Sequence, residues 1–227
     1  MAEYETIRSV GAGTRAAQID QGLRAYMNKV YGLMSVGTLL TGGVAWAVGS
    51  SPALLSIFRN PETLQPNILG WIVMFAPLAM VFMFGSVMRR ASAAGAQLFF
   101  YSYAAVMGLS MAWIFAAFTG ESIATTFFVT AIAFAGTSLY GYVTKRNLSA
   151  MGTFFMMGLI GLLVAMVVNI FLASSALAFA ISVIGVLIFA GLTAYDTQNI
   201  KNTYLEHAQM GDSEWLGKSA IMGALNL

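Results

Sequence analysis

Long apolar runs separated by short polar stretches fill most of the chain. A helix needs roughly 20 apolar residues to cross a bilayer, and six of the runs reach that length. They do not alternate polar and apolar residues as the strands of a membrane barrel do, so the pattern predicts helices. The predicted spanning helices are residues 29–50, 67–88, 94–118, 122–144, 151–172 and 176–198.

The segments outside these runs complete the predicted organisation. Residues 1–25 are polar and small and are predicted to form an N-terminal tail, while residues 26–227 form a single transmembrane helical domain. Residues 50–67 hold three of the four prolines and predict a loop. The connection LASSA, residues 172–176, predicts a tight turn between the last two spanning helices.

A seventh apolar element begins at Lys218 with the sequence KSAIMGALNL. Ten helical residues rise about 15 Å, which is half the thickness of a bilayer. We therefore expect this chain to contain only the first part of a seventh helix that continues further. The predicted fold class is an all-α polytopic membrane protein.

Composition agrees with the apolar pattern and excludes several functions. The chain is 59% hydrophobic and 9% charged, whereas soluble proteins carry about 25% charged residues. The net charge of +2 is too small to predict a nucleic-acid partner, and the absence of cysteine excludes disulfides and Cys-based zinc sites. No metalloprotease, phosphate-loop or serine-hydrolase motif is present, so we expect no enzymatic activity.

Basic residues predict the orientation in the membrane. Arg59 is the only one of the eleven that falls on the side of the predicted topology opposite the N-terminus. The other ten are Arg8, Arg15, Arg24, Lys29, Arg89, Arg90, Lys145, Arg146, Lys201 and Lys218. Because Lys and Arg accumulate in cytoplasmic loops, we predict a cytoplasmic N-terminus.

One carboxylate lies inside a run that otherwise avoids charge. Asp196, in the segment GLTAYDTQNIK at 191–201, is the only charged residue between Arg146 and Lys201. We place it about 7–8 Å inside the cytoplasmic edge of the sixth span. Burial there is costly for a carboxylate, and the negative end of the helix dipole adds to the cost.

Polar residues accompany Asp196 along one side of the same helix. Thr193, Asn199 and Thr203 lie at i−3, i+3 and i+7 from Asp196 and form a polar stripe. Such a stripe predicts a face turned to the bundle interior or to water, with Asp196 as an ion or proton site. The alternative is an interfacial aspartate that only caps a helix or pairs with Arg89, Arg90 or Lys145.

Three other polar residues have simpler interpretations. Glu121 opens the fourth span, where the helix dipole favours a carboxylate. Asn169, near the outer end of the fifth span, is predicted to form a hydrogen bond with a neighbour rather than to line a pore. His207 lies in a polar loop and is predicted to be a solvated surface residue. We assign no metal ligand.

Several segments resemble the Bax inhibitor-1/YccA family, also called the transmembrane Bax-inhibitor-motif family. The resemblance lies in GLTAYDTQNIK, in IDQGLRAYMNKVYGLM at the entry to the first span and in the closing ALNL, and it extends over the whole chain. It implies a compact seven-helix bundle with a central last helix, located in the bacterial inner membrane.

The resemblance also implies a pH-sensitive calcium leak. In the family, a pair of aspartates near the cytoplasmic side shares a proton, and Asp196 matches the first of the pair. The second is expected after Leu227. A second-helix arginine is expected to latch the aspartate, and Arg89 and Arg90 are the two candidates. No resident cofactor is implied, only transient Ca²⁺.

Two main functional hypotheses follow, beside a third in which the protein is an intramembrane scaffold without transport. The first is a calcium-permeable leak channel or ion exchanger gated by a buried Asp196. The second is a regulatory protein without transport that binds a membrane-bound AAA protease, with the tail of residues 1–25 as the contact. In both cases the bilayer is the surrounding partner.

Overall fold

The computed structural model describes residues 2–60, 62–207 and 213–227, with side chains described from residue 18 onward except that of Ser213. Apart from a single bridge between Arg59 and Pro66, the described secondary structure is helical. The helices are α1 (Ala2–Gly49), α2 (Pro52–Leu55), α3 (Ile68–Arg90), α4 (Ala93–Met111), α5 (Ile114–Ala117), α6 (Gly120–Val143), α7 (Ser149–Leu172), α8 (Ser175–His207) and α9 (Ser213–Asn226).

Six stretches of the described residues are long and apolar enough to cross a membrane. They are Gln18–Gly49, Ile68–Arg90, Ala93–Ala117, Gly120–Val143, Ser149–Leu172 and Ser175–His207. The prediction of an all-helical polytopic membrane protein with six spans is therefore confirmed.

Two helices are longer than the apolar pattern predicts. The backbone of α1 is helical from Ala2, so it includes most of the segment expected as a tail. The sixth spanning helix, α8, continues to His207. Residues 199–207 contain neither glycine nor proline, so nothing in the local sequence ends the helix once it leaves the apolar run.

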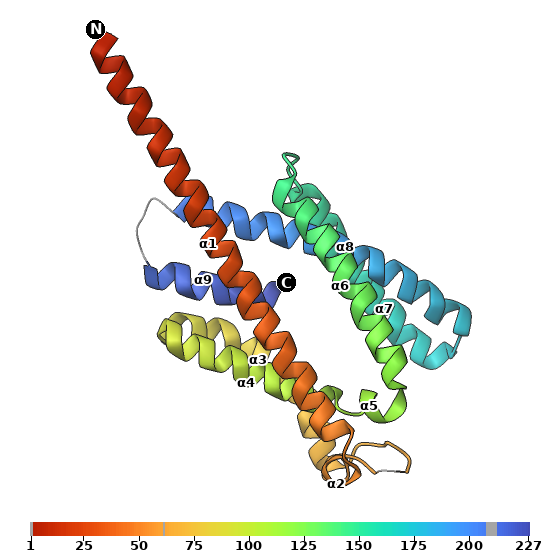
Figure 1. Ribbon diagram of the computed structural model, residues 1–227. Helices are drawn as coiled ribbons and strands as arrows, with labels where there is room; N and C mark the ends of the chain where they lie inside the picture. The colour runs from red at the N-terminus through yellow and green to blue at the C-terminus, as the bar shows by residue number, and fades with distance from the viewer. Residues whose placement is uncertain (1, 61, 208–212) are drawn as a thin grey trace. The chain divides into compact units, whose positions relative to one another are not determined.

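The described residues divide into two units. The first contains the described residues within 2–126 and 207–226, and the second contains residues 127–206 and Leu227. In the first unit, α1 packs along α4 and α3 packs on the other side of α4 (Figure 1). Gly108 allows the close α1–α4 contact, because a Cβ there would overlap the Thr41 backbone. The Thr41 hydroxyl also donates a hydrogen bond to the Ala104 carbonyl at 2.8 Å.

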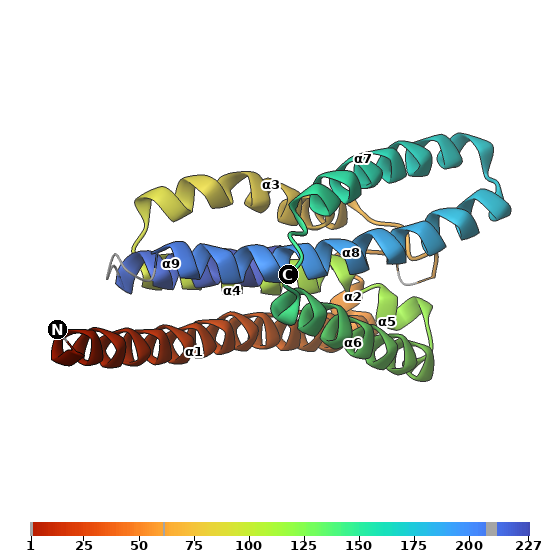
Figure 2. The same ribbon diagram turned by 90° about the horizontal axis from the view of Figure 1, so that it is seen from above.

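The C-terminal helix α9 packs against both α1 and α4 (Figure 2). It begins at Ser213, five residues before the predicted start of the seventh element at Lys218. Ala220, Ile221 and Ala224 are buried, and the Tyr26 and Ser219 hydroxyls are 2.8 Å apart. Its apolar residues therefore belong to the core of the first unit.

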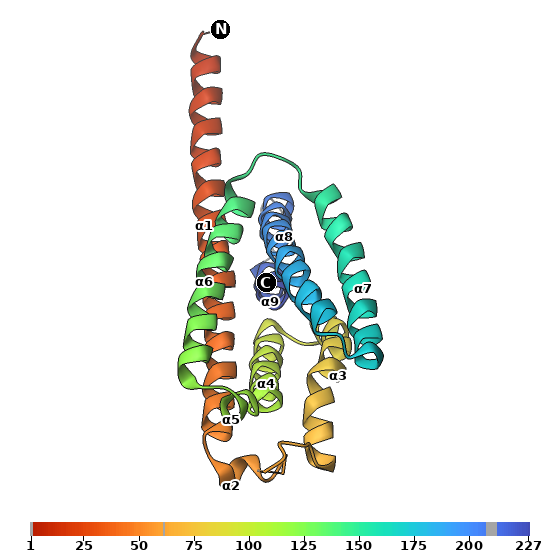
Figure 3. The same cartoon turned by 90° about the vertical axis from the view of Figure 1, so that its right-hand side faces the viewer.

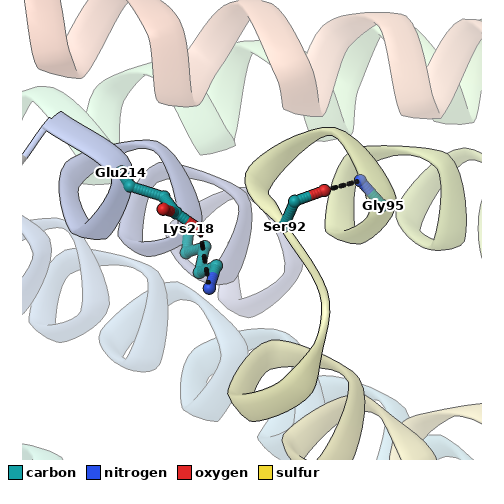
Figure 4. Close-up of polar contacts among 4 residues, drawn as sticks. All are labelled: Ser92, Gly95, Glu214 and Lys218. Atoms are coloured by element: carbon teal, nitrogen blue, oxygen red, sulfur yellow. Dashed lines mark hydrogen bonds and ion pairs between the residues drawn. The ribbon is translucent and has the colours of Figure 1, made fainter.

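Polar contacts support the ends of α4 and α9 (Figure 4). The Ser92 hydroxyl accepts a hydrogen bond from the Gly95 N–H at 3.3 Å and caps α4. Within α9, Lys218 and Glu214 form an i,i+4 ion pair at 3.1 Å. Since the Glu214 side chain is exposed, this pair contributes little to stability.

The proline-rich linker forms a small folded loop around Arg59. The Arg59 backbone pairs with that of Pro66, and the Arg59 guanidinium donates a hydrogen bond to the Leu64 carbonyl at 2.7 Å. The same guanidinium lies 5.6 Å from the centre of the Trp113 ring, within the distance of a cation–π contact.

The second unit contains most of α6 together with α7 and α8. Figure 3 shows α7 and α8 side by side, joined by a short turn. Leu162 of α7 and Ile188 and Leu192 of α8 form a buried cluster between them. Gly141 of α6 meets the backbone carbonyl of Ala194, so α6 and α8 approach each other closely. These contacts place the middle of α8 against both of its neighbours.

The turn between α7 and α8 is as short as predicted. Ala173 has φ 48° and ψ 34°, in the left-handed region that ends many helices. The Asn169 side chain accepts a hydrogen bond from the Ser174 N–H at 3.1 Å, as the simpler interpretation of this residue predicted. The Ser174 hydroxyl in turn accepts one from the Leu177 N–H and supports the start of α8.

Replacing Ala173 by glycine is expected to stabilise the protein by about 0.5–1 kcal/mol, because a left-handed alanine costs roughly 1–2 kcal/mol, partly offset by the flexibility of glycine in the unfolded chain. Thermal unfolding in detergent measures the change. Ala178→Gly, at an exposed position within α8, is the control and should destabilise by up to about 1 kcal/mol. Destabilisation by both variants would contradict the prediction.

Candidate site on α8

The motif GLTAYDTQNIK lies within α8, and its whole backbone is helical. Asp196 is partly exposed, so the expectation of a buried aspartate is corrected. Among the described side chains, the buried polar ones are Ser138, Thr197 and Gln198, and none is acidic. The carboxylate forms no hydrogen bond or ion pair with the part of the chain that the structure describes.

Thr197 joins α8 to α6. Its side chain is 0% exposed, and its Oγ1 lies 3.0 Å from the Oγ of Ser138. The Thr197 hydroxyl donates a hydrogen bond to the Thr193 carbonyl one turn earlier at 2.8 Å. The Thr197 side chain is therefore bonded both within α8 and to α6.

Gln198 holds the connection between α6 and α7. Its Oε1 accepts a hydrogen bond from the Leu148 N–H at 2.9 Å, and its Nε2 donates one to the Arg146 carbonyl at 2.8 Å. Leu148 is the residue that precedes α7 and has no side-chain cap of its own. The amide group of Gln198 therefore satisfies backbone atoms at the start of α7.

Lys201 performs the corresponding role at the end of α6. Its Nζ donates a hydrogen bond to the Tyr142 carbonyl at 2.8 Å and lies 5.3 Å from the centre of the Tyr142 ring. Since α6 ends at Val143, this carbonyl belongs to the last turn of the helix. A cation at that end also interacts favourably with the helix dipole.

The residues of the polar stripe predicted beside Asp196 are less buried than Thr197 and Gln198. The Thr193 hydroxyl donates to the Phe189 carbonyl of its own helix at 2.9 Å. Asn199 is exposed and Thr203 is partly exposed. The sequence reasoning did not assign a role to Thr197 or Gln198. The available signal was that both are polar and follow Asp196 directly inside a membrane helix.

Comparison with known proteins identifies the family. The model of a family described as "Inhibitor of apoptosis-promoting Bax1" matches residues 23–227. The chain belongs to this Bax inhibitor-1 family. The prediction made from the motif is confirmed, and the matched region contains the whole of α8 and α9.

Bacterial relatives match over most of their length. The chain is 44% identical to the Inner membrane protein YbhL of Escherichia coli over 207 residues, which are 91% of this chain and 86% of the relative. An uncharacterized protein of Caulobacter vibrioides is 43% identical over 223 residues, 97% of this chain and 88% of the relative. A Rickettsia prowazekii protein is 43% identical over 209 residues, 92% and 84% of the two chains. No solved structure matches.

The two candidate latch residues of this Bax inhibitor-1 family member lie in the other unit. Arg89 and Arg90 form the last turn of α3, and both are exposed. The Arg89 Nε donates a hydrogen bond to the Gly85 carbonyl of its own helix at 3.2 Å. A latch between either arginine and Asp196 stays a prediction.

Two further residues of the family member have clear surroundings. Glu121 lies in the first turn of α6, as predicted. His207 is only partly exposed, and its ring stacks on Trp215 with 4.0 Å between centroids and 18° between planes. It is therefore less solvated than predicted. Within the described residues, no group of three His, Cys, Asp or Glu side chains could hold a metal ion.

Proposed function

We propose that this Bax inhibitor-1 family protein is a pH-sensitive, calcium-permeable leak channel or ion exchanger of the bacterial inner membrane, with Asp196 as its ion-sensing and pH-sensing group. One observation carries the proposal. Asp196 is a carboxylate within a membrane-spanning helix that makes no hydrogen bond or ion pair with the described residues, whereas Thr197, Gln198 and Lys201 each have defined partners.

The physical cost of the carboxylate supports a functional role. An acidic group within a membrane helix is expensive and marks ion or proton pathways in many proteins. Thr197, Gln198 and Lys201 make the hydrogen bonds that join α8 to α6 and the α6–α7 connection, and Asp196 takes no part in them. Ionised, it offers the oxygen ligands that Ca²⁺ prefers, and protonation removes that charge.

The topology in the proposal follows from the basic residues. We place the N-terminus and the α6–α7 connection, with Lys145 and Arg146, in the cytoplasm. Residues 1–25 are the proposed tail, and residues 26–227 the domain of a seven-helix bundle that α9 contributes to. Arg89 and Arg90 are the proposed latch residues, and Thr193, Asn199 and Thr203 the proposed polar surroundings of Asp196.

Asp196→Asn is expected to abolish the pH response of calcium flux, because asparagine keeps the shape of the side chain but cannot titrate. Purified protein in liposomes loaded with a calcium indicator measures the flux between mildly acidic and mildly alkaline buffers. A single titrating group changes the wild-type flux by up to about tenfold per pH unit. In the variant, the ratio of the flux in alkaline buffer to the flux in acidic buffer should be one.

Glu206→Gln is the matched control for this experiment. It removes the same charge from an exposed position on the same helix, and the pH response should persist. Two results would together overturn the proposal. One is a wild-type calcium flux that does not depend on pH, and the other is a flux through D196N equal to that of the wild type.

A further inference from the structure

Three neighbouring contacts set the rotation of α8 about its own axis. Thr197 reaches Ser138 in α6, Gln198 reaches the α6–α7 connection and Lys201 reaches the last turn of α6. The Ala194 backbone, on the same side, lies against Gly141. All four residues point within about 100° of one another on a helical wheel with 100° per residue.

Asp196 falls outside that contact face. On the same wheel it lies about 150° from the centre of the four contact positions. The next residue, Thr197, is fully buried, while Asp196 itself is partly exposed. A rotation of α8 by one residue position toward α6 would turn Asp196 toward α6 and break the four hydrogen bonds that join α8 to α6 and the α6–α7 connection.

We propose that Gln198 and Lys201, a pair that we call the clamp, are positioning residues for Asp196. By holding the end of α6 and the start of α7, they fix the rotation of α8 and keep Asp196 on the side turned away from α6. The inference rests on the proposed role of Asp196. It adds that two residues without contact to an ion control the surroundings in which the carboxylate titrates.

The chemistry of both residues suits this role. Gln198 uses its donor and its acceptor on two backbone groups, so its side chain is held at both atoms. Lys201 combines a hydrogen bond with a ring contact to the same residue, Tyr142. An arginine could reproduce both contacts of the lysine, whereas a methionine could reproduce neither.

Cysteine labelling tests the positioning without any transport measurement. The chain has no cysteine, so single cysteines at Thr197 and at Asn199 report a buried and an exposed position of α8. With the wild-type clamp, T197C should resist a water-soluble maleimide and N199C should react. Adding Gln198→Ala or Lys201→Met should raise the labelling rate of T197C about tenfold. This is the change expected when the loss of a buried hydrogen bond makes local opening of the helix contact more favourable. N199C should not change, and Lys201→Arg should restore protection.

The pH profile of calcium flux links the clamp to Asp196. Gln198→Ala and Lys201→Met should shift the midpoint of the profile, and Lys201→Arg should leave it in place. Unchanged protection of T197C in both loss variants would overturn the inference whatever the flux does. So would lost protection with an unshifted midpoint. Lost protection in a protein whose wild-type flux has no pH response would instead overturn the proposed function, while the clamp itself would stand.

Discussion

Replacing Gly141 by alanine is expected to lower the free energy of unfolding by about 3 kcal/mol, at the upper end of the usual cost of overpacking. A Cβ at this position would overlap the Ala194 carbonyl oxygen, and the carbonyl carbon would be only 2.9 Å away. The obstacle is backbone of α8, which cannot change rotamer, so the two helices must separate. Their separation would also stretch the neighbouring bond between Ser138 and Thr197.

Thermal unfolding in detergent measures this effect. A loss of about 3 kcal/mol corresponds to a fall of about 6–12 °C in the melting temperature of a chain of this size. Gly161→Ala is the matched control, because Gly161 lies in α7 and a Cβ there would meet no atom within 4 Å. It should gain up to about 1 kcal/mol from the better helix propensity of alanine. Similar melting temperatures for the two variants would show that α6 and α8 do not touch at Gly141.

Hydropathy predicted the helices well because lipid leaves the backbone few alternatives. In a bilayer every N–H and C=O must be satisfied internally, so an apolar run of sufficient length becomes a helix whatever its neighbours are. The ends of α1 and α8 were harder to predict, since in water a helix continues until a residue or a tertiary contact ends it. Both helices extend beyond their apolar runs, α1 from Ala2 and α8 to His207.

The contacts between helices could not be predicted from the same pattern. A run that is apolar on all sides does not indicate which face meets another helix. Gly108 and Gly161 are both helical glycines within predicted spans, yet a Cβ at Gly108 would overlap Thr41 and a Cβ at Gly161 would meet nothing. Only the three-dimensional arrangement distinguishes them.

The candidate site was predicted in part. Asp196 could be found from the sequence because an isolated charge in an apolar run is costly wherever the helix packs. Gln198 could not, because its partners are backbone atoms of Arg146 and Leu148, about 50 residues earlier in the chain. No side-chain pattern records such a contact, since every residue carries the same backbone groups.

Gln198→Leu is expected to lower the free energy of unfolding by about 2–3 kcal/mol, because a buried backbone group left without a partner costs about 1–3 kcal/mol. Leu148 is 3% exposed, so its N–H cannot turn to water when Oε1 is removed. Arg146 is exposed, and its carbonyl can be hydrated more easily. Most of the loss should therefore come from the Leu148 N–H, and thermal unfolding in detergent measures it.

Two further variants separate the lost hydrogen bond from a general effect of leucine. Gln198→Glu keeps an acceptor for the Leu148 N–H but loses the donor to the Arg146 carbonyl and adds a charge at a buried position, so we expect a loss at least as large as that of Gln198→Leu. Gln97→Leu removes a glutamine whose amide, within the described part of the chain, forms a hydrogen bond only with the Tyr101 hydroxyl, one turn along its own helix, and should change stability by less than about 0.5 kcal/mol. A loss in Gln198→Leu no larger than that in Gln97→Leu would contradict the assignment of the Leu148 N–H to Gln198.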